Sequence, residues 1–196
     1  MTAVVGFFGK LPAHGDFVRR GLPVEVTAAL DAWIQREFGR AEDPAAAIAD
    51  LSPLRFATTA LAPGQLALGA MVASSDSVGR AYVAVALHLA RHPVVDLPDP
   101  VPEAWDDWCA RAEAILTAAQ GRTWTADATQ AALETAARAT VIALAPSLFL
   151  VANNGVAETV AWRPLFGSGG CALSRSVGLP SGDDFDRIAA PLAALT

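Results

Sequence analysis

Three long apolar segments between residues 55 and 90 restrict the possible folds of this chain more than any other feature. The segment RFATTAL (55–61) is followed by LALGAMVAS (66–74) and AYVAVALHLA (81–90). Residues 62–65 separate the first two, and their proline followed by glycine favours a type II turn. The polar bend SDSVGR (75–80) separates the second from the third. Because the apolar character is sustained along each segment, we predict a meander of strands in a sheet that is covered on both faces.

Amphipathic helices flank this meander in the sequence. Residues 24–38 place apolar side chains on one face of a helix, and residues 105–119 form a second apolar stripe. A third helix is predicted at 125–144, and a last helix opens with Ser181 and Asp184 at the spacing of a capping box. Further strands are predicted at residues 3–8, 147–152 and 158–162. The sequence therefore predicts one α/β domain, with a largely antiparallel or mixed sheet and helices on both sides of it.

Length and composition favour a single domain, residues 1–196, with a large core. Hydrophobic residues make up 53% of the chain and charged residues 17%, which is too apolar for a disordered protein. The formal net charge of −6 disfavours nucleic acid and anionic membranes as partners, since both repel an acidic protein. Residues 139–157 carry no charge, but Pro146 interrupts them and their apolar part is too short to span a bilayer. The N-terminus has no basic leader, so we expect a cytoplasmic protein without membrane insertion.

The segment GFFGKLPAHGDFVRRG (6–21) places glycines and a lysine directly after a predicted strand, as in loops that bind nucleotide phosphates. Such a P-loop requires the pattern G-x-x-x-x-G-K-[ST]. When Lys10 is aligned to its lysine, Val4 replaces the first glycine and Leu11 replaces the hydroxyl residue that binds magnesium. Pro12 also removes a backbone amide donor. We therefore expect no nucleotide, and because no cysteine or histidine spacing indicates a metal, we expect no cofactor of any kind.

Lys10 is the only lysine in the chain, and apart from the histidines every other basic residue is an arginine. This usage indicates that a compact ammonium, and not a planar guanidinium, is required at this position. The simplest structural interpretation is that Lys10 pairs with Asp16 and braces the turn around Pro12 and Gly15. Charges in loops seldom take part in chemistry, so this structural interpretation stands beside any functional one.

A second polar segment, SSDSVGR (74–80), follows the predicted strand 66–74. If that strand lies beside strand 3–8 and runs in the same direction, the loops after both strands emerge at one edge of the sheet. The side chains that we then predict to share a polar patch are Lys10, Asp16, Asp76 and Arg80.

Three motifs, taken in order, resemble those of a known family. GKLPAHGDF (9–17), SSDSVGR (74–80) and VGLP (177–180) are similar to motifs of the TagF (ImpM) family of type VI secretion-associated proteins. The likeness extends from Val5 to about residue 192, so the chain resembles a single TagF-like domain. It departs from the family at SLFLVANNG (147–155), where relatives carry a tryptophan-rich strand.

The resemblance implies regulation and not catalysis. Members of the TagF family are cytoplasmic accessory proteins and post-translational repressors of type VI secretion, with a three-layer α/β/α sandwich fold. They are linked to the forkhead-associated scaffold protein of the secretion machine, which is therefore the expected partner. The motif residues that the resemblance assigns to the functional patch are Lys10, Pro12, Gly15, Asp16, Ser75, Asp76, Gly79 and Arg80.

An enzyme that uses the same patch is the alternative. Ser75, His14 and Asp16 supply the residue types of a hydrolase triad, but the sequence has no G-x-S-x-G elbow. A small-molecule or phosphoryl enzyme remains open, and it would need a concave site with a base or a bound metal.

Four other residues attract attention. Trp124 lies in a connector and is a candidate anchor for a partner. Asp106 and Asp107 fall on the polar face of a predicted helix, so we expect water around both. His88 lies within an apolar strand, and we interpret it as a core histidine and not as a ligand.

Overall fold

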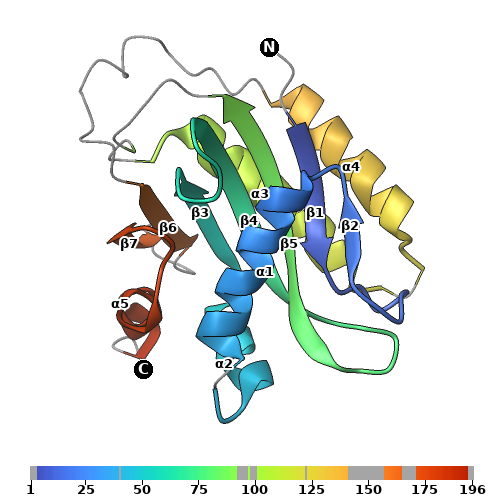
Figure 1. Cartoon of the computed structure of the whole chain (residues 1–196), viewed down its shortest axis with the longest axis horizontal. Coiled ribbons are helices and arrows are strands. Elements are labelled where there is room, and N and C mark those ends of the chain that lie inside the picture. The colour runs from blue at the N-terminus through green and yellow to red at the C-terminus, as the bar shows by residue number, and fades with distance from the viewer. Residues whose placement is uncertain are drawn as a thin grey trace.

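The computed structural model describes residues 4–39, 41–91, 97, 101–121, 123–140, 157–164 and 171–193. Within these residues an antiparallel seven-stranded sheet has the strand order β2-β1-β5-β4-β3-β6-β7 (Figure 1). Its strands are β1 Val4–Gly9, β2 Val18–Arg20, β3 Leu54–Thr58, β4 Gln65–Ser75, β5 Ala81–Arg91, β6 Glu158–Pro164 and β7 Cys171–Val177. The predicted meander is the centre of this sheet, since β3 pairs with β4 and β4 pairs with β5 along its whole length.

Helices cover both faces of the sheet, which confirms the three-layer α/β/α prediction (Figure 1). One face carries α1 Val24–Phe38, α2 Pro44–Leu51 and α5 Gly182–Ala193, and the other carries α3 Glu103–Ala118 and α4 Ala126–Ala139. No described helix has the length and apolarity that a membrane crossing needs.

The turn between β3 and β4 has the predicted chemistry. Gln65 donates its amide to the carbonyl of Ala62 over 3.2 Å, and Gly64 has a φ of +68°, as the third residue of a type II turn requires. Any residue with a Cβ would have a strained backbone at this φ, which explains why position 64 is a glycine.

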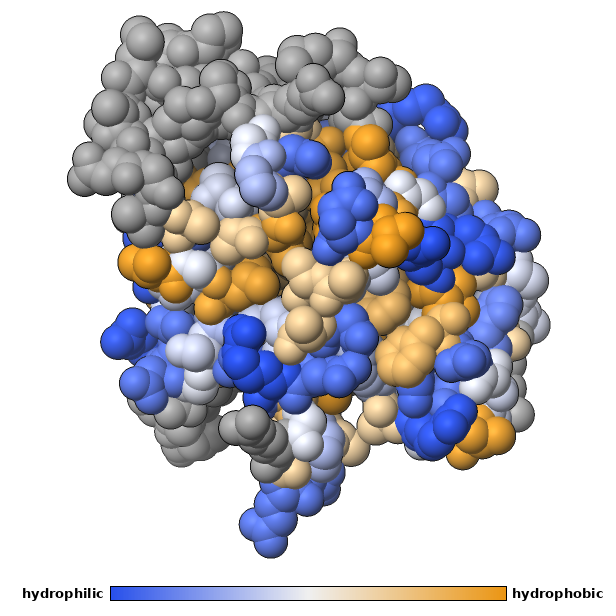
Figure 2. Space-filling view, in the orientation of Figure 1, coloured by the Kyte–Doolittle hydropathy of each residue, from blue (hydrophilic) through white to orange (hydrophobic). Residues whose placement is uncertain are grey.

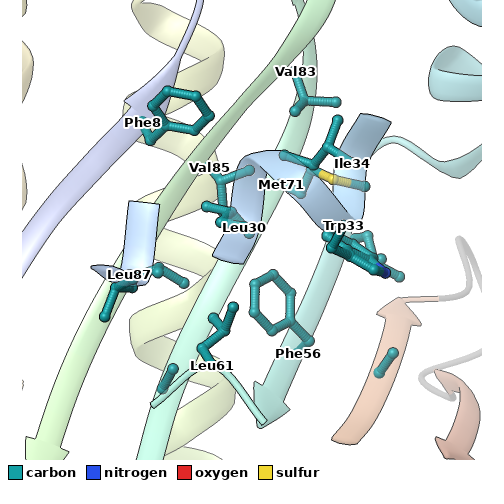
Figure 3. Packing of buried hydrophobic residues seen from close by; sticks show 14 of the residues in the cluster. Phe8, Leu30, Trp33, Ile34, Phe56, Leu61, Met71, Val83, Val85 and Leu87 are labelled. Carbon is teal, nitrogen blue, oxygen red and sulfur yellow. The ribbon is translucent and has the colours of Figure 1, made fainter. Parts of the chain in front are cut away.

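One core fills the space between the sheet and α1. The apolar face predicted for this helix is buried, and the ring of Phe56 lies among Leu30, Leu61 and Trp33 in Figure 3. Trp33 also donates its indole N–H to the carbonyl of Pro180 over 2.7 Å, in the VGLP segment between β7 and α5. This hydrogen bond joins α1 to the segment that precedes α5.

The second core lies between the sheet and α3. The predicted stripe of α3 faces it, and Trp108 and Leu116 are fully buried there. A network of ion pairs lies at the edge of this core. Arg55 of β3 donates to Asp106 and Glu113 of α3, each over 2.8 Å.

Asp106 is therefore not a freely solvated residue, and that expectation was wrong. Besides its ion pair with Arg55, it accepts the indole N–H of Trp162 over 2.6 Å. The sequence shows only that Asp106 lies on the polar side of a helix. It does not show that the side chains of Arg55, from β3, and Trp162, from β6, lie beside Asp106.

Three elements were not predicted from the sequence: β2, α2 and β7. Strand β2 has only three residues, and α2 is a short alanine-rich helix whose start is set by Asp43, which caps the amides of Ala45 and Ala46. The continuation of the helix at 125–144 beyond Thr140, and the strand at 147–152, lie outside the described residues, as does SLFLVANNG (147–155).

Candidate functional site

The loops after β1 and β4 meet at one edge of the sheet, as predicted, but the two strands are not neighbours. Each pairs with β5, antiparallel, so β1 and β4 run in the same direction on either side of it. Direct hydrogen bonds join the loops: Ser77 donates its amide to the carbonyl of His14 over 2.8 Å, and Ser74 Oγ donates to the carbonyl of Lys10 over 2.6 Å. The predicted juxtaposition is correct, and the predicted strand adjacency is wrong.

Asp76 lies at the centre of this edge, and its side chain is fully buried. Its Oδ1 accepts the backbone amides of Val78, over 3.1 Å, and Arg80, over 2.9 Å. Its Oδ2 lies 3.1 Å from the ammonium of Lys10 and 2.6 Å from Nε of Arg80. Each oxygen therefore has two donors; those of Oδ1 come from its own loop, and those of Oδ2 come from both loops.

These donors set the charge of Asp76. Burial alone would raise the pKa of the carboxyl group. The backbone amide of Arg80, the ammonium of Lys10, the guanidinium of Arg80 and the amide of Val78 outweigh that effect, and together they hold the Asp76 pKa well below its ordinary value of 3.8. Asp76 is an anion at neutral pH.

Lys10 is the buried partner of this anion and forms no ion pair or hydrogen bond with Asp16. Only 7% of Lys10 is exposed. Its ammonium also lies 3.4 Å from the carbonyl of Arg80, 5.2 Å from the ring centre of Phe17 and 6.0 Å from that of Tyr82. Two aromatic rings and one carboxylate thus surround it, an environment that suits a compact ammonium.

The predicted pair between Lys10 and Asp16 is accordingly wrong. Asp16 is exposed and accepts the amide of the next residue, Phe17, over 2.8 Å. It caps its own turn. The carboxylate that neutralises Lys10 comes from 66 positions farther along the chain, in the second loop of the predicted patch.

Arg80 joins the buried pair to the surface. Its Nε contacts Asp76, a terminal nitrogen donates to the carbonyl of Gly15 over 2.9 Å, and 63% of the side chain is exposed. Gly79, just before it, has a φ of +86° and donates to the carbonyl of Asp76 over 3.0 Å. Only glycine adopts this conformation without strain, so the bend that presents Arg80 depends on it.

An aromatic group that the sequence analysis did not single out completes the edge. Phe17, 45% exposed, stacks on Phe8 with ring centres 5.7 Å apart, and meets Tyr82 edge-to-face at 4.8 Å. The hydroxyl of Tyr82 donates to Asp31 of α1 over 2.6 Å. An aromatic residue directly after Gly15 and Asp16, at the polar end of the loop, is the signal that could have identified Phe17.

The remaining predicted residues have smaller parts in this edge. Pro12 and Ser75 are half-buried, and Gly15 is exposed and contributes its carbonyl to Arg80. Trp124 is half-buried and packs against the second core, so most of its contact surface is already used within the chain. No group of three or more metal-ligating side chains occurs among the described residues.

The chain is similar to one family and to a solved structure. Residues 6–136 match the model of a family described as the TagF N-terminal domain, type VI secretion system-associated. The structure resembles the crystal structure of PA0076 from Pseudomonas aeruginosa PAO1, with a TM-score of 0.63 and 24% identity, over 94% of this chain and 93% of that one. This likeness shows a common fold. No curated protein matches the sequence.

Proposed function

Because this chain belongs to the TagF N-terminal domain family, which is associated with type VI secretion, we propose that it is a non-enzymatic regulator that binds another protein of the secretion machine. The proposed effect is post-translational repression in the cytoplasm. The proposed partner is the forkhead-associated scaffold protein, which the motif resemblance implies. The observation that carries the proposal is the network of Lys10, Asp76 and Arg80, which joins two motif-bearing loops at one edge of the sheet.

The chemistry of this network favours binding over catalysis. A general base needs access to its substrate and a pKa near the working pH. Asp76 has neither, since its side chain is fully buried, accepts four hydrogen bonds and has a lowered pKa. The ammonium of Lys10 is likewise enclosed. An enzyme that uses this patch would have to break the network to expose either group.

The buried pair has a positioning role in this account. Lys10 and Asp76 belong to different loops, so their ion pair fixes the position of one loop relative to the other. Arg80 and Phe17, which both contact the pair and are both partly exposed, are presented to the partner. Ordering the loops before binding reduces the entropy cost of forming the complex.

Calorimetric titration of the purified chain with the purified forkhead-associated scaffold protein of its own secretion cluster tests the proposal. We expect binding by the parent and weaker binding by Lys10→Met, which keeps an unbranched side chain but removes the cation that joins the loops. Arg187→Ala is the matched control, because Arg187 is also a cation in an ion pair but lies on α5, at the opposite end of the sheet. Thermal unfolding of each variant separates weaker binding from loss of the fold.

Two results would contradict the proposal. Absence of binding by the folded parent would remove the scaffold protein as the partner. Hydrolysis of a phosphoester or nucleotide by the purified parent, if it disappears in Asp76→Asn while the variant stays folded, would establish the enzyme in its place.

A further inference from the structure

The residues around the buried pair leave a mixed apolar and basic surface exposed. We use the name Phe17 surface for Phe17, Arg19, Val78 and Arg80. Phe17 and Val78 are two of the five large hydrophobic residues that are exposed in the described structure, at 45% and 73%. Arg19 and Arg80 are exposed beside them in the chain. In Figure 2, hydrophobic and hydrophilic surface lie side by side over the bend between β4 and β5, at the lower right.

Phe17 is held in place before any partner arrives. Its ring contacts Phe8, Tyr82 and the ammonium of Lys10, on three different strands or loops. A fixed aromatic ring that is still about half exposed loses little conformational entropy on binding, and aromatic residues are enriched among the residues that dominate binding energy. Arg80 is fixed in the same way by Asp76 and Gly15.

The register of β1 and β2 places Arg19 on the same side of the sheet as this ring. Arg19 is opposite Phe8, the residue on which Phe17 stacks. Arg20 is opposite Phe7 and points to the other side, where it pairs with Asp127 of α4 over 2.8 Å. Among the described residues Arg19 forms no salt bridge, so its charge is available to a partner.

The charge of this surface is opposite to that of the chain. The protein has a net charge of −6. The edge holds Lys10, Arg19 and Arg80 together with Asp16, Asp31 and Asp76, but the Asp76 carboxylate is buried against two of these cations and Asp31 accepts the hydroxyl of Tyr82. An acidic protein that concentrates exposed arginines beside an exposed aromatic ring at one edge favours a partner that brings carboxylates there.

We propose that the Phe17 surface binds an acidic segment of the partner, in which an apolar side chain packs on Phe17 and Val78 while carboxylates pair with Arg19 and Arg80. The inference rests on the proposed function for the partner's identity, and adds the surface and the chemistry that recognise it. Arginine binds a carboxylate through two parallel N–H donors, which gives such a contact a defined geometry.

Titration of the purified scaffold protein with two separate variants tests the inference. Arg19→Glu reverses an exposed charge that has no ion pair to lose, and Phe17→Ala removes the ring. Arg187→Glu and Val177→Ala are the matched controls, since they are an exposed arginine and an exposed valine on α5 and β7. We expect each test variant to weaken binding about tenfold or more, and the controls to bind like the parent.

Ionic strength supplies an independent readout. If carboxylates meet Arg19 and Arg80, the affinity of the parent decreases as salt rises, and Arg19→Glu reduces that dependence. Parental affinity in both folded test variants would overturn the surface but leave the scaffold as partner. Affinity that does not change with salt would overturn the acidic segment. No binding by the parent under any condition would overturn the proposed function, and with it this assignment.

Discussion

A single methyl group added to Gly69 should destabilise the protein, because the ring of Phe56 occupies the space. Gly69 on β4 is the cross-strand partner of Phe56 on β3. A Cβ at Gly69 would lie 2.3 Å from Cζ of the ring and 2.6 and 2.7 Å from its two Cε atoms. Phe56 is only 3% exposed and belongs to the core beneath α1 (Figure 3), so its ring has no free path to solvent.

Two opposing contributions set the size of the effect. Forcing an extra methyl group into a packed core costs about 1–3 kcal/mol. Replacing glycine by alanine in a strand recovers roughly 0.5–1 kcal/mol of backbone entropy. The difference between these contributions spans about 0–2.5 kcal/mol. Because a Cβ would meet three ring atoms, we expect Gly69→Ala to fall in the upper half of that span, to lower the free energy of unfolding by about 1–2 kcal/mol, and to lower Tm by about 2–8 °C for a domain of this size.

A double-mutant cycle with Phe56→Leu isolates the contact, with urea unfolding as the assay. Phe56→Leu alone destabilises by removing buried ring area, but the smaller leucine side chain leaves room for the methyl group that Gly69→Ala adds. Gly69→Ala should then cost less in the Phe56→Leu background than in the parent, with a coupling of at least about 0.5 kcal/mol. A neutral Gly69→Ala, or strictly additive effects, would show that the ring does not cover this glycine.

Three further predictions concern buried polar groups. Burial lowers the pKa of His88 below its ordinary 6.5, so the unfolded chain binds more protons there, and the free energy of unfolding should fall as pH drops below 6.5. That dependence should be smaller in His88→Gln, as urea titrations across this pH range measure. Arg55→Met should cost about 1–3 kcal/mol in thermal unfolding, less than loss of a fully buried ion pair, because the two carboxylates that lose their cation, Asp106 and Glu113, are 45% and 22% exposed. Full burial raises the pKa of the Cys109 thiol, so in a Cys171→Ser background a maleimide should react only after unfolding, and rapid labelling of the native protein would contradict the described core.

Local patterns in the sequence predicted the parts of the fold that depend on local physics. The apolar face of α1 follows from a helical period, and the turn at Gly64 follows from proline and glycine chemistry. Both are properties of a few consecutive residues. The central strands were recognisable because a sheet covered on two faces requires sustained apolar segments.

The parts that were missed depend on contacts between distant residues. Nothing near Lys10 in the sequence indicates that its partner is Asp76 and not Asp16, since that choice depends on the insertion of β5 between β1 and β4. Asp106 looks solvated on its own helix, and only the sheet brings Arg55 beside it. The two loops meet although β1 and β4 are not neighbours, because the strands run in the same direction and only β5 lies between them.

Repression of secretion in living cells tests the central claim most directly, namely that the chain regulates type VI secretion through this edge. The measurement is the amount of secreted substrate released by cells that overproduce the parent, Arg19→Glu or Arg187→Glu at equal levels. We predict that the parent and Arg187→Glu both reduce release, and that Arg19→Glu, with its folded core intact, leaves release unchanged. Equal repression by all three proteins would contradict the claim that the edge formed by the two loops contacts the secretion machine.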